Sequence, residues 1–127
     1  MTTYVNVIGD KWIFIDSNID FNDYYLKDSV IRDNNNIKVW VKRVYNQGNK
    51  IIYFLMPHII NDTSDNIHHS LLYYSIDYIK INYRIESMLH YNSDDVLIFD
   101  VKPNAGCNEI RPDSNVEKLI RQIINKL

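Results

Sequence analysis

The residues best suited to chemistry are one cysteine and four histidines. Cys107 carries the single thiol of the chain, and a nearby histidine such as His68, His69 or His90 would be the base that activates it as a nucleophile. The residues around it, 104–109, match neither a nucleophile elbow nor a cysteine-protease signature. We therefore interpret Cys107 as a partly buried structural cysteine beside a turn, and we predict a protein without catalytic residues.

A second group has residue types that bind metals. It comprises two successive histidines and three residues that precede them: His68, His69, His58, Asp62 and Asp65. Adjacent residues of a strand point to opposite sides, and the chain contains no His-x3-His or Cys-x2-Cys spacing. The pattern indicates a polar loop over 58–70 rather than a metal site. We expect no metal and no cofactor, and we keep these five residues as candidates for contact with a partner.

A third group combines aromatic and basic side chains on a predicted strand. Its members surround one tryptophan: Trp40, Lys38, Lys42 and Arg43, with Lys80 and Arg84 on a nearby strand. Such a surface can stack single-stranded bases. The chain has 14 basic and 16 acidic residues and a net charge of -2, whereas nucleic-acid binders usually show a basic excess. We expect no nucleic-acid partner, and we retain Tyr24, Trp40 and Lys42 as candidates for binding another protein.

Length and composition limit the remaining choices. A chain of 127 residues that is 46% hydrophobic forms one domain with a real core. No apolar run reaches the roughly 18–20 residues needed to span a membrane. The first ten residues lack the features of a secretion signal, and one cysteine suits a reducing compartment. A full-length chain of this kind is expected in the cytoplasm, and a chain trimmed of its leader at the cell surface. Abundant Asn, Ile, Lys and Tyr are typical of a low-GC bacterium.

The elements that must position these residues are mostly short β-strands separated by Asn- and Asp-rich turns. The predicted strands cover 11–16, 23–27, 37–45, 51–56, 71–86 (one long strand or a bent pair), 88–91 and 96–101. The predicted turns lie at 33–36, 46–49 and 92–95. The strand over 37–45 has the clearest alternation, because Ile37, Val39 and Val41 fall on one face and Trp40 and Lys42 on the other.

The last segment changes to a helical period. Apolar residues recur at spacings of three and four: Val116, Leu119, Ile120, Ile123, Ile124 and Leu127. Ser114 and Glu117 have the spacing of a capping box, which predicts that the helix begins there. The apolar stripe must be buried against the sheet. We therefore predict one α+β domain over 1–127, with an antiparallel sheet of about six strands at 4–101 and a helix at 114–127 packed on one face.

The order of these segments resembles the surface-adhesin protein E family. The resemblance is carried by Asp10-Lys11-Trp12, Tyr24 to Val30, Ile37-Lys38-Val39-Trp40, Ser75-Ile76-Asp77-Tyr78 with Arg84, and Ile110-Arg111-Pro112-Asp113-Ser114 before the closing helix. It covers nearly the whole chain and implies an antiparallel sheet of about six strands with the C-terminal helix against it. It also implies an exported protein that adheres to host proteins.

The chain departs from that family at the disulfide that joins the closing helix to the sheet. Tyr78 stands at the position expected for the sheet cysteine, the end of the helix has no cysteine, and Cys107 replaces the tryptophan before the Ile-x-Pro-x-Ser stretch. Loss of the leader and of both cysteines is what a cytosolic relative would show.

These observations favour a binding protein over an enzyme. We expect a bacterial, intracellular inhibitor that binds another protein, for instance an immunity protein that neutralises a basic toxin by charge complementarity. The alternative is an adhesin-like module that binds host proteins at the cell surface. A small enzyme or a binder of single-stranded nucleic acid is a third hypothesis with little support. An open sheet leaves edge strands, so a homodimer is also expected as one way to protect them.

Overall fold

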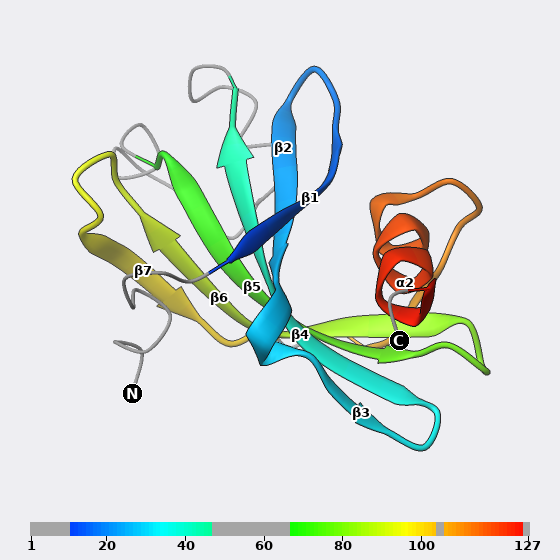
Figure 1. Cartoon of the computed structure of the whole chain (residues 1–127). Coiled ribbons are helices and arrows are strands. Elements are labelled where there is room, and N and C mark those ends of the chain that lie inside the picture. The colour runs from blue at the N-terminus through cyan, green and yellow to red at the C-terminus, as the bar shows by residue number, and fades with distance from the viewer. Residues whose placement is uncertain (1–10, 47–66, 104–105, 126–127) are drawn as a thin grey trace.

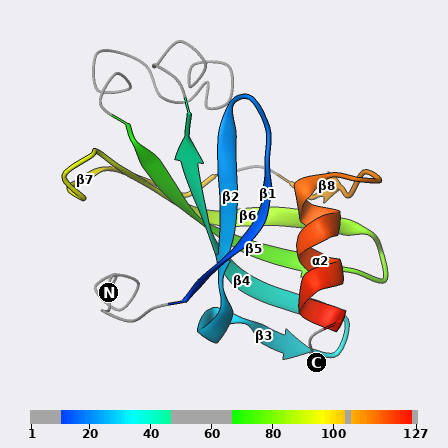
Figure 2. The same cartoon turned by 45° about the horizontal axis from the view of Figure 1, so that its top comes forward.

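The computed structural model describes residues 11–46, 67–103 and 106–125. Within these ranges the chain forms strands, one short 3-10 turn and one α-helix (Figures 1 and 2). In chain order they are β1 (Trp12–Ser17), β2 (Phe21–Leu26), η2 (Lys27–Ser29), β3 (Ile31–Asp33), β4 (Asn36–Tyr45), β5 (His69–Asp77), β6 (Asn82–Tyr91), β7 (Leu97–Val101), β8 (Asn108–Glu109) and α2 (Asn115–Asn125). None of the described helices combines the length and apolar character needed to cross a membrane.

The strands form one antiparallel sheet with six positions. Six strands lie in the order β1-β2-β4-β5-β6-β7, while β3 pairs with β4 and β8 pairs with β6. β3 and β2 pair with the same edge of β4, at its beginning and at its end respectively. In the same way, β8 and β7 pair with one edge of β6, at its beginning and at its end. The predicted fold class is confirmed. Eight strands fill six positions, because β3 pairs with β4 beside β2 and β8 pairs with β6 beside β7.

A serine holds the interruption between β2 and β3 in place. The hydroxyl of Ser29 donates to the carbonyl of Leu26 at 2.8 Å and accepts from the backbone N–H of Trp40 at 3.0 Å. It thus replaces one bond of the sheet ladder where the neighbouring strand is absent. The short strand β3 was not predicted, because its residues Ile31–Asp33 are exposed and show no alternation.

The predicted alternation on β4 is confirmed. Ile37, Val39 and Val41 are essentially inaccessible and belong to the main core, while Lys38 and Lys42 face the other side. β4 pairs with β2 and β3 on one side and along its length with β5 on the other, so it lies at the centre of the sheet.

The segment predicted as one long strand or a bent pair over 71–86 is a hairpin. β5 ends at Asp77, whose Oδ1 accepts from the backbone N–H groups of Ile79 and Lys80 at 3.1 and 2.9 Å. Ile81 adopts a positive φ of 59°, and β6 then begins at Asn82. The predicted strand is therefore interrupted between Asp77 and Asn82, where Ile79 and Ile81 lie in the turn and are 61% and 55% exposed.

Other predicted boundaries shift by a few residues. β5 already begins at His69, so the predicted loop over 58–70 is wrong at its last two residues. The turn at 92–95 is confirmed, because Oδ1 of Asn92 accepts from the N–H groups of Asp94 and Val96. The predicted strand over 51–56 lies outside the described residues, as does the predicted turn at 46–49 after its first residue.

The helix α2 begins where the capping pattern predicted. Oγ of Ser114 accepts from the N–H of Glu117 at 3.3 Å, and the Glu117 carboxylate accepts from the N–H of Asp113 at 2.8 Å. Val116, Leu119 and Ile123 are buried in the main core cluster. Figure 1 shows α2 beside one side of the twisted sheet, far from β7. We call the sheet face against α2 the helix-side face.

Candidate functional site

The face of the sheet opposite α2 collects aromatic side chains from five strands. We call it the aromatic face; it consists of Trp12, Phe14, Tyr24, Trp40, Lys42, His69, Tyr73 and Tyr91. The pairing register places them together, because Phe14 lies opposite Tyr24, Tyr24 opposite Lys42, Trp40 opposite Tyr73 and His69 opposite Tyr91. Directly opposed residues share one side of a sheet.

The exposed part of the aromatic face lies along β1 and β2. Phe14 is 50% exposed and contacts Tyr24 edge-on, with ring centroids 5.7 Å apart. Lys42 places its ammonium 5.7 Å from the ring centroid of Trp12, within the range of a cation–π contact. These four side chains form a continuous surface of rings around one cation.

Trp40 lies on the same face of the sheet but is buried, so it is not part of the exposed surface. It is only 8% exposed and packs on Tyr73 with ring centroids 4.8 Å apart, in a cluster with Leu26, Leu71 and Leu89. Trp40, a candidate for binding another protein, is therefore buried in a strand that lies inside the sheet between β2 and β5.

The two adjacent histidines differ in burial, because His69 is the first residue of β5 and buried, whereas His68 precedes the strand and is exposed. His69 is buried, stacks on Tyr91 with centroids 5.1 Å apart, and places Nε2 3.3 Å from a carboxylate oxygen of Asp95. The Nδ1 atoms of His68 and His69 are 2.9 Å apart, so one must donate and the other accept. The network fits a neutral His69 that donates from Nε2 to Asp95 and accepts at Nδ1.

Burial supports the neutral form of His69. Removal from water, followed by the nearby Lys42 charge, lowers the pKa of His69 to about 4, although Asp95 acts in the opposite direction. His69 is thus a packed neutral side chain at the end of the aromatic face, while His68 is exposed.

The structure brings together only part of the predicted candidates. Tyr24, Lys42, Trp40 and His69 share the aromatic face, and His68 contacts His69 at its end. His58, Asp62 and Asp65 lie outside the described residues. Among the residues that are described, no three His, Cys, Asp or Glu side chains are grouped as a metal site.

Cys107 is exposed, which corrects the prediction that it is partly buried. It precedes the two-residue strand β8 and makes no hydrogen bond to a histidine within the described part of the chain. A serine–histidine contact does exist elsewhere: Oγ of Ser70 lies 2.6 Å from Nδ1 of His90 and 3.0 Å from the Tyr45 hydroxyl. Ser70 and His90 are both 0% exposed, so this contact lies inside the core.

The helix-side face contains a buried ion pair that the sequence patterns did not reveal. The Arg43 guanidinium donates to both carboxylate oxygens of Asp23 at 2.9 Å and lies 3.8 Å from the Phe21 ring centroid. Asn115, at the start of α2, donates to the same carboxylate at 2.8 Å. The one sequence signal for this pair is the alternation on β2 and β4, which puts Asp23 and Arg43 at positions that otherwise hold core residues. Two opposite charges at core positions of two strands could have indicated a buried ion pair.

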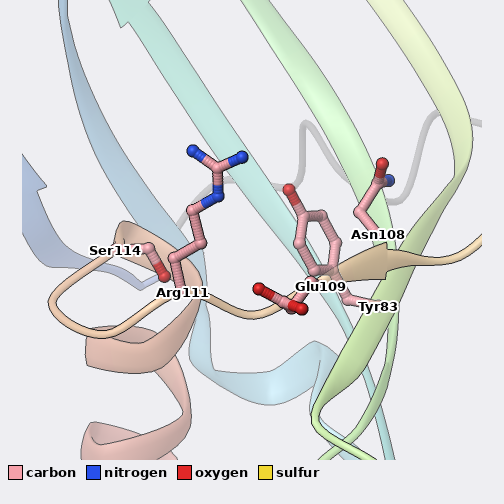
Figure 3. A pocket seen from close by; sticks show the side chains of 5 residues that line it. All are labelled: Tyr83, Asn108, Glu109, Arg111 and Ser114. Carbon is pink, nitrogen blue, oxygen red and sulfur yellow. The ribbon is translucent and has the colours of Figure 1, made fainter.

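A half-open cleft lies between the start of α2 and the helix-side face. Its larger part has a volume of about 430 Å³ and is lined by Asp16, Asn18, Phe21, Arg43, Tyr74, Tyr83, Asp113, Ser114, Asn115 and Val116. An adjoining hollow of about 340 Å³ shares Tyr83 and Ser114 with it. Figure 3 shows this hollow, with the Arg111 guanidinium and the Tyr83 ring on either side of it.

Comparison with known proteins adds no assignment: no protein-family model, curated protein or solved structure matches this chain.

Proposed function

We propose that this protein is a non-enzymatic binding domain that contacts another protein with the exposed part of its aromatic face. The observation that carries the proposal is the surface formed by Trp12 and Phe14 on β1, Tyr24 on β2 and Lys42 on β4. It lies opposite the helix, and Phe14 is half exposed although its ring is large and apolar.

Aromatic rings beside one cation have the composition of a protein-binding hot spot. Large rings contribute contact area with few rotatable bonds, and interfaces are enriched in Tyr, Trp and Phe. Here one of the rings is anchored, because Trp12 is half-buried and packs against the cluster that contains Trp40, Leu71 and Leu89. A surface held in place before binding loses less entropy on association.

For the partner, we propose a toxin or comparable effector neutralised inside a bacterial cell, as an immunity protein would do. The exposed free thiol of Cys107 suits a reducing compartment, and the net charge of -2 complements a basic partner. The alternative is an adhesin-like module at the cell surface that binds host proteins. It rests on the order of segments, which resembles that of the surface-adhesin protein E family.

Capture of the tagged full-length chain from its native cells tests this function. Three versions are compared: the wild type, Phe14→Glu on the aromatic face, and Arg111→Ala on the helix-side face as a control. Both substituted side chains are exposed, so both variants should keep the fold. We expect one stoichiometric protein partner with the wild type and Arg111→Ala, and its loss with Phe14→Glu.

The cell fraction in which the partner is found separates the two roles. A cytoplasmic partner that loses its toxicity when bound supports the inhibitor, and an envelope location with binding to host proteins supports the adhesin-like module. A partner retained equally by Phe14→Glu would show that the aromatic face is not the contact surface.

A further inference from the structure

The first half of the edge strand β1 directs backbone groups away from the sheet. The backbone N–H of Lys27 donates to the carbonyl of Lys11 at 3.2 Å, and the register of β1 with β2 places these two residues opposite each other. Lys11 and Ile13 therefore face β2, because hydrogen-bonded and non-hydrogen-bonded pairs alternate along an antiparallel ladder. The N–H and C=O groups of Trp12 and Phe14 then point away from β2.

The hydrogen bonds on the other side of β2 give the same result. The backbone N–H of Asn46 donates to the carbonyl of Asp20 at 2.8 Å, so every second residue from Asp20 along β2 directs its groups towards β4. Tyr24 is one of these residues, and its neighbour Tyr25 consequently faces β1. Tyr25 lies opposite Ile13, which agrees with an Ile13 that faces β2.

Within the part of the chain that the structure describes, no other element pairs with this edge. β1 is the first strand of the sheet order and pairs only with β2. The helix α2 binds the second half of the strand, where the Gln122 side chain donates to the carbonyl of Ile15, and the first half runs away from the helix (Figures 1 and 2). Unpaired backbone groups at a sheet edge are a template for another strand. We call the N–H and C=O groups of Trp12 and Phe14 the open edge of β1.

The side chains beside the open edge suit an apolar contact. Trp12 and Phe14 both place their rings on the aromatic face, where Phe14 is half exposed and Trp12 half-buried. Residues that lie directly opposite each other in two paired strands place their side chains on the same face. A strand added to the open edge therefore sets every second side chain against these two rings.

The charges beside the open edge are mainly positive. Lys11 and Lys27 lie opposite each other at its start, and the Lys42 ammonium lies 5.7 Å from the ring centroid of Trp12. Asp28 follows Lys27 in η2. None of these lysines forms an ion pair with a described residue. An acidic side chain in an added strand is therefore favoured over a basic one.

We propose that the protein partner supplies an extended segment that adds to the open edge of β1 as a further strand of the sheet. Its backbone bonds to the N–H and C=O groups of Trp12 and Phe14, which repeat about every 7 Å as the groups of an extended chain do. Its apolar side chains lie on the aromatic face, and an acidic side chain lies near the lysines.

This inference rests on the function proposed above, because it specifies how the partner meets the aromatic face. The acidic preference concerns the bound segment and not the net charge of the whole partner.

Amide hydrogen exchange of the isotopically labelled full-length protein, followed by NMR, tests the open edge. The probe is a short acetylated and amidated peptide in which valine and threonine alternate between terminal glutamates, Glu-Val-Thr-Val-Thr-Val-Glu. We expect the Trp12 and Phe14 amides to exchange about tenfold or more slowly at saturating peptide than in the free protein. The Ile13 amide is bonded to β2 and should exchange slowly in both states, so it is the internal control.

Methylation of the peptide nitrogens distinguishes its two edges. Residues opposite Trp12 and Phe14 share the aromatic face, so the valines should carry the groups that bond to the open edge, and the threonine nitrogens should lie on the outer side. We expect the threonine-methylated peptide to protect the Trp12 and Phe14 amides and the valine-methylated peptide to leave them unprotected.

Two substitutions at one position separate the backbone from the ring. Phe14→Ala and Phe14→Pro both remove the ring, but only proline removes the N–H. Proline is tolerated on an edge strand where its missing N–H would face solvent, so both variants should keep the fold. We expect the peptide to bind Phe14→Ala several-fold more weakly than the wild type, as a lost apolar contact predicts, and not to bind Phe14→Pro.

The same two variants, used as baits beside Phe14→Glu, separate this inference from the function itself. A partner that is lost with Phe14→Glu but retained equally by Phe14→Ala and Phe14→Pro would leave the aromatic face as the contact surface and overturn strand addition. Peptide binding as described, without any captured partner, would contradict the proposed function and support the open edge as a strand-binding site.

Three results with the peptide would overturn the proposal. They are unchanged exchange of the Trp12 and Phe14 amides, equal protection by the two methylated peptides, and equal binding to Phe14→Ala and Phe14→Pro. Protection of the same amides in the protein alone, rising with protein concentration, would assign the open edge to a second copy of this chain and would overturn it as well.

Discussion

Asp23 and Arg43 form the most deeply buried ion pair among the described residues, with side chains 1% and 17% exposed. The Asp23 carboxylate accepts two bonds from Arg43 and one from Asn115, so three elements meet at one side chain. A buried pair adds little net stability when it is complete, but loss of one partner leaves an uncompensated charge.

Replacement of Arg43 by methionine should therefore destabilise the protein strongly. We expect Arg43→Met to lower the free energy of unfolding by about 3–5 kcal/mol, because the Asp23 carboxylate stays buried without its cation. Arg121→Ala, which breaks an exposed pair on α2, should change the free energy of unfolding far less. Urea denaturation measures both changes. Equal effects of the two substitutions would contradict a dominant role for the buried pair.

His69 should make the stability of the protein depend on pH. Its pKa is lowered from 6.5 to about 4 in the fold, so between these values the unfolded chain binds a proton that the folded protein does not. Stability is complete above pH 6.5 and falls as the pH drops towards 4, by about 3 kcal/mol in total.

His69→Gln removes this titration and should flatten the stability curve over that window. Urea midpoints of both proteins, measured from pH 7 to pH 4, give the comparison. Lys118 lowers the pKa of Asp16, and the Asp113 N–H lowers that of Glu117, so both carboxylates protonate at lower pH. They also remain in both proteins. Parallel curves for wild type and His69→Gln would contradict the assignment.

At the scale of elements, α2 packs on the helix-side face and also binds the edge strand β1 through its side chains. Lys118 pairs with Asp16, and the Gln122 side chain donates to the carbonyl of Ile15 at 3.3 Å. Ile15 is the extra residue where the pairing of β1 with β2 shifts register, so the helix binds a carbonyl at an irregular point of the ladder.

The stability that α2 contributes should come from its buried stripe. Leu119 is 1% exposed and Ile124 is 37% exposed, and both are large apolar residues of the same helix. We expect Leu119→Ala to cost about 2–5 kcal/mol, and Ile124→Ala less than about 1 kcal/mol. Thermal and urea unfolding measure the difference. Similar costs would mean that the helix is not seated on the sheet as described.

At the scale of the whole molecule, the two outer strands of the sheet differ in their protection. β1 is bound by α2, whereas the described residues pair β7 only with β6. Leu97, the first residue of β7, and Val96 just before it are 41% and 55% exposed. An exposed edge with apolar residues is a template for pairing with another chain.

We therefore expect any homodimer of this protein to form through β7. Light scattering after size-exclusion chromatography should show a mass that rises with concentration for the wild type, and a monomer for Leu97→Lys. Phe14→Lys, an equally exposed change on the other edge strand, should leave the mass unchanged. Dimers that survive in Leu97→Lys would place the interface elsewhere.

The sequence by itself determined the parts of this protein that depend on local periodicity. Alternation over 37–45, the turn at 92–95 and the capped helix after Ser114 each follow from hydrogen bonds and apolar spacing within a few residues. These elements imply the α+β class, because a sheet and an amphipathic helix have only each other to pack against.

Only the tertiary structure decided which side chains meet. Trp40 is buried on β4 inside the sheet, whereas Cys107 is exposed just before the short strand β8, and no local pattern contains this arrangement. The contact of Asp23 with Arg43 and Asn115 joins residues up to 92 positions apart. Strand order and register place such residues together, and they are set by the packing of the whole core rather than by any one segment.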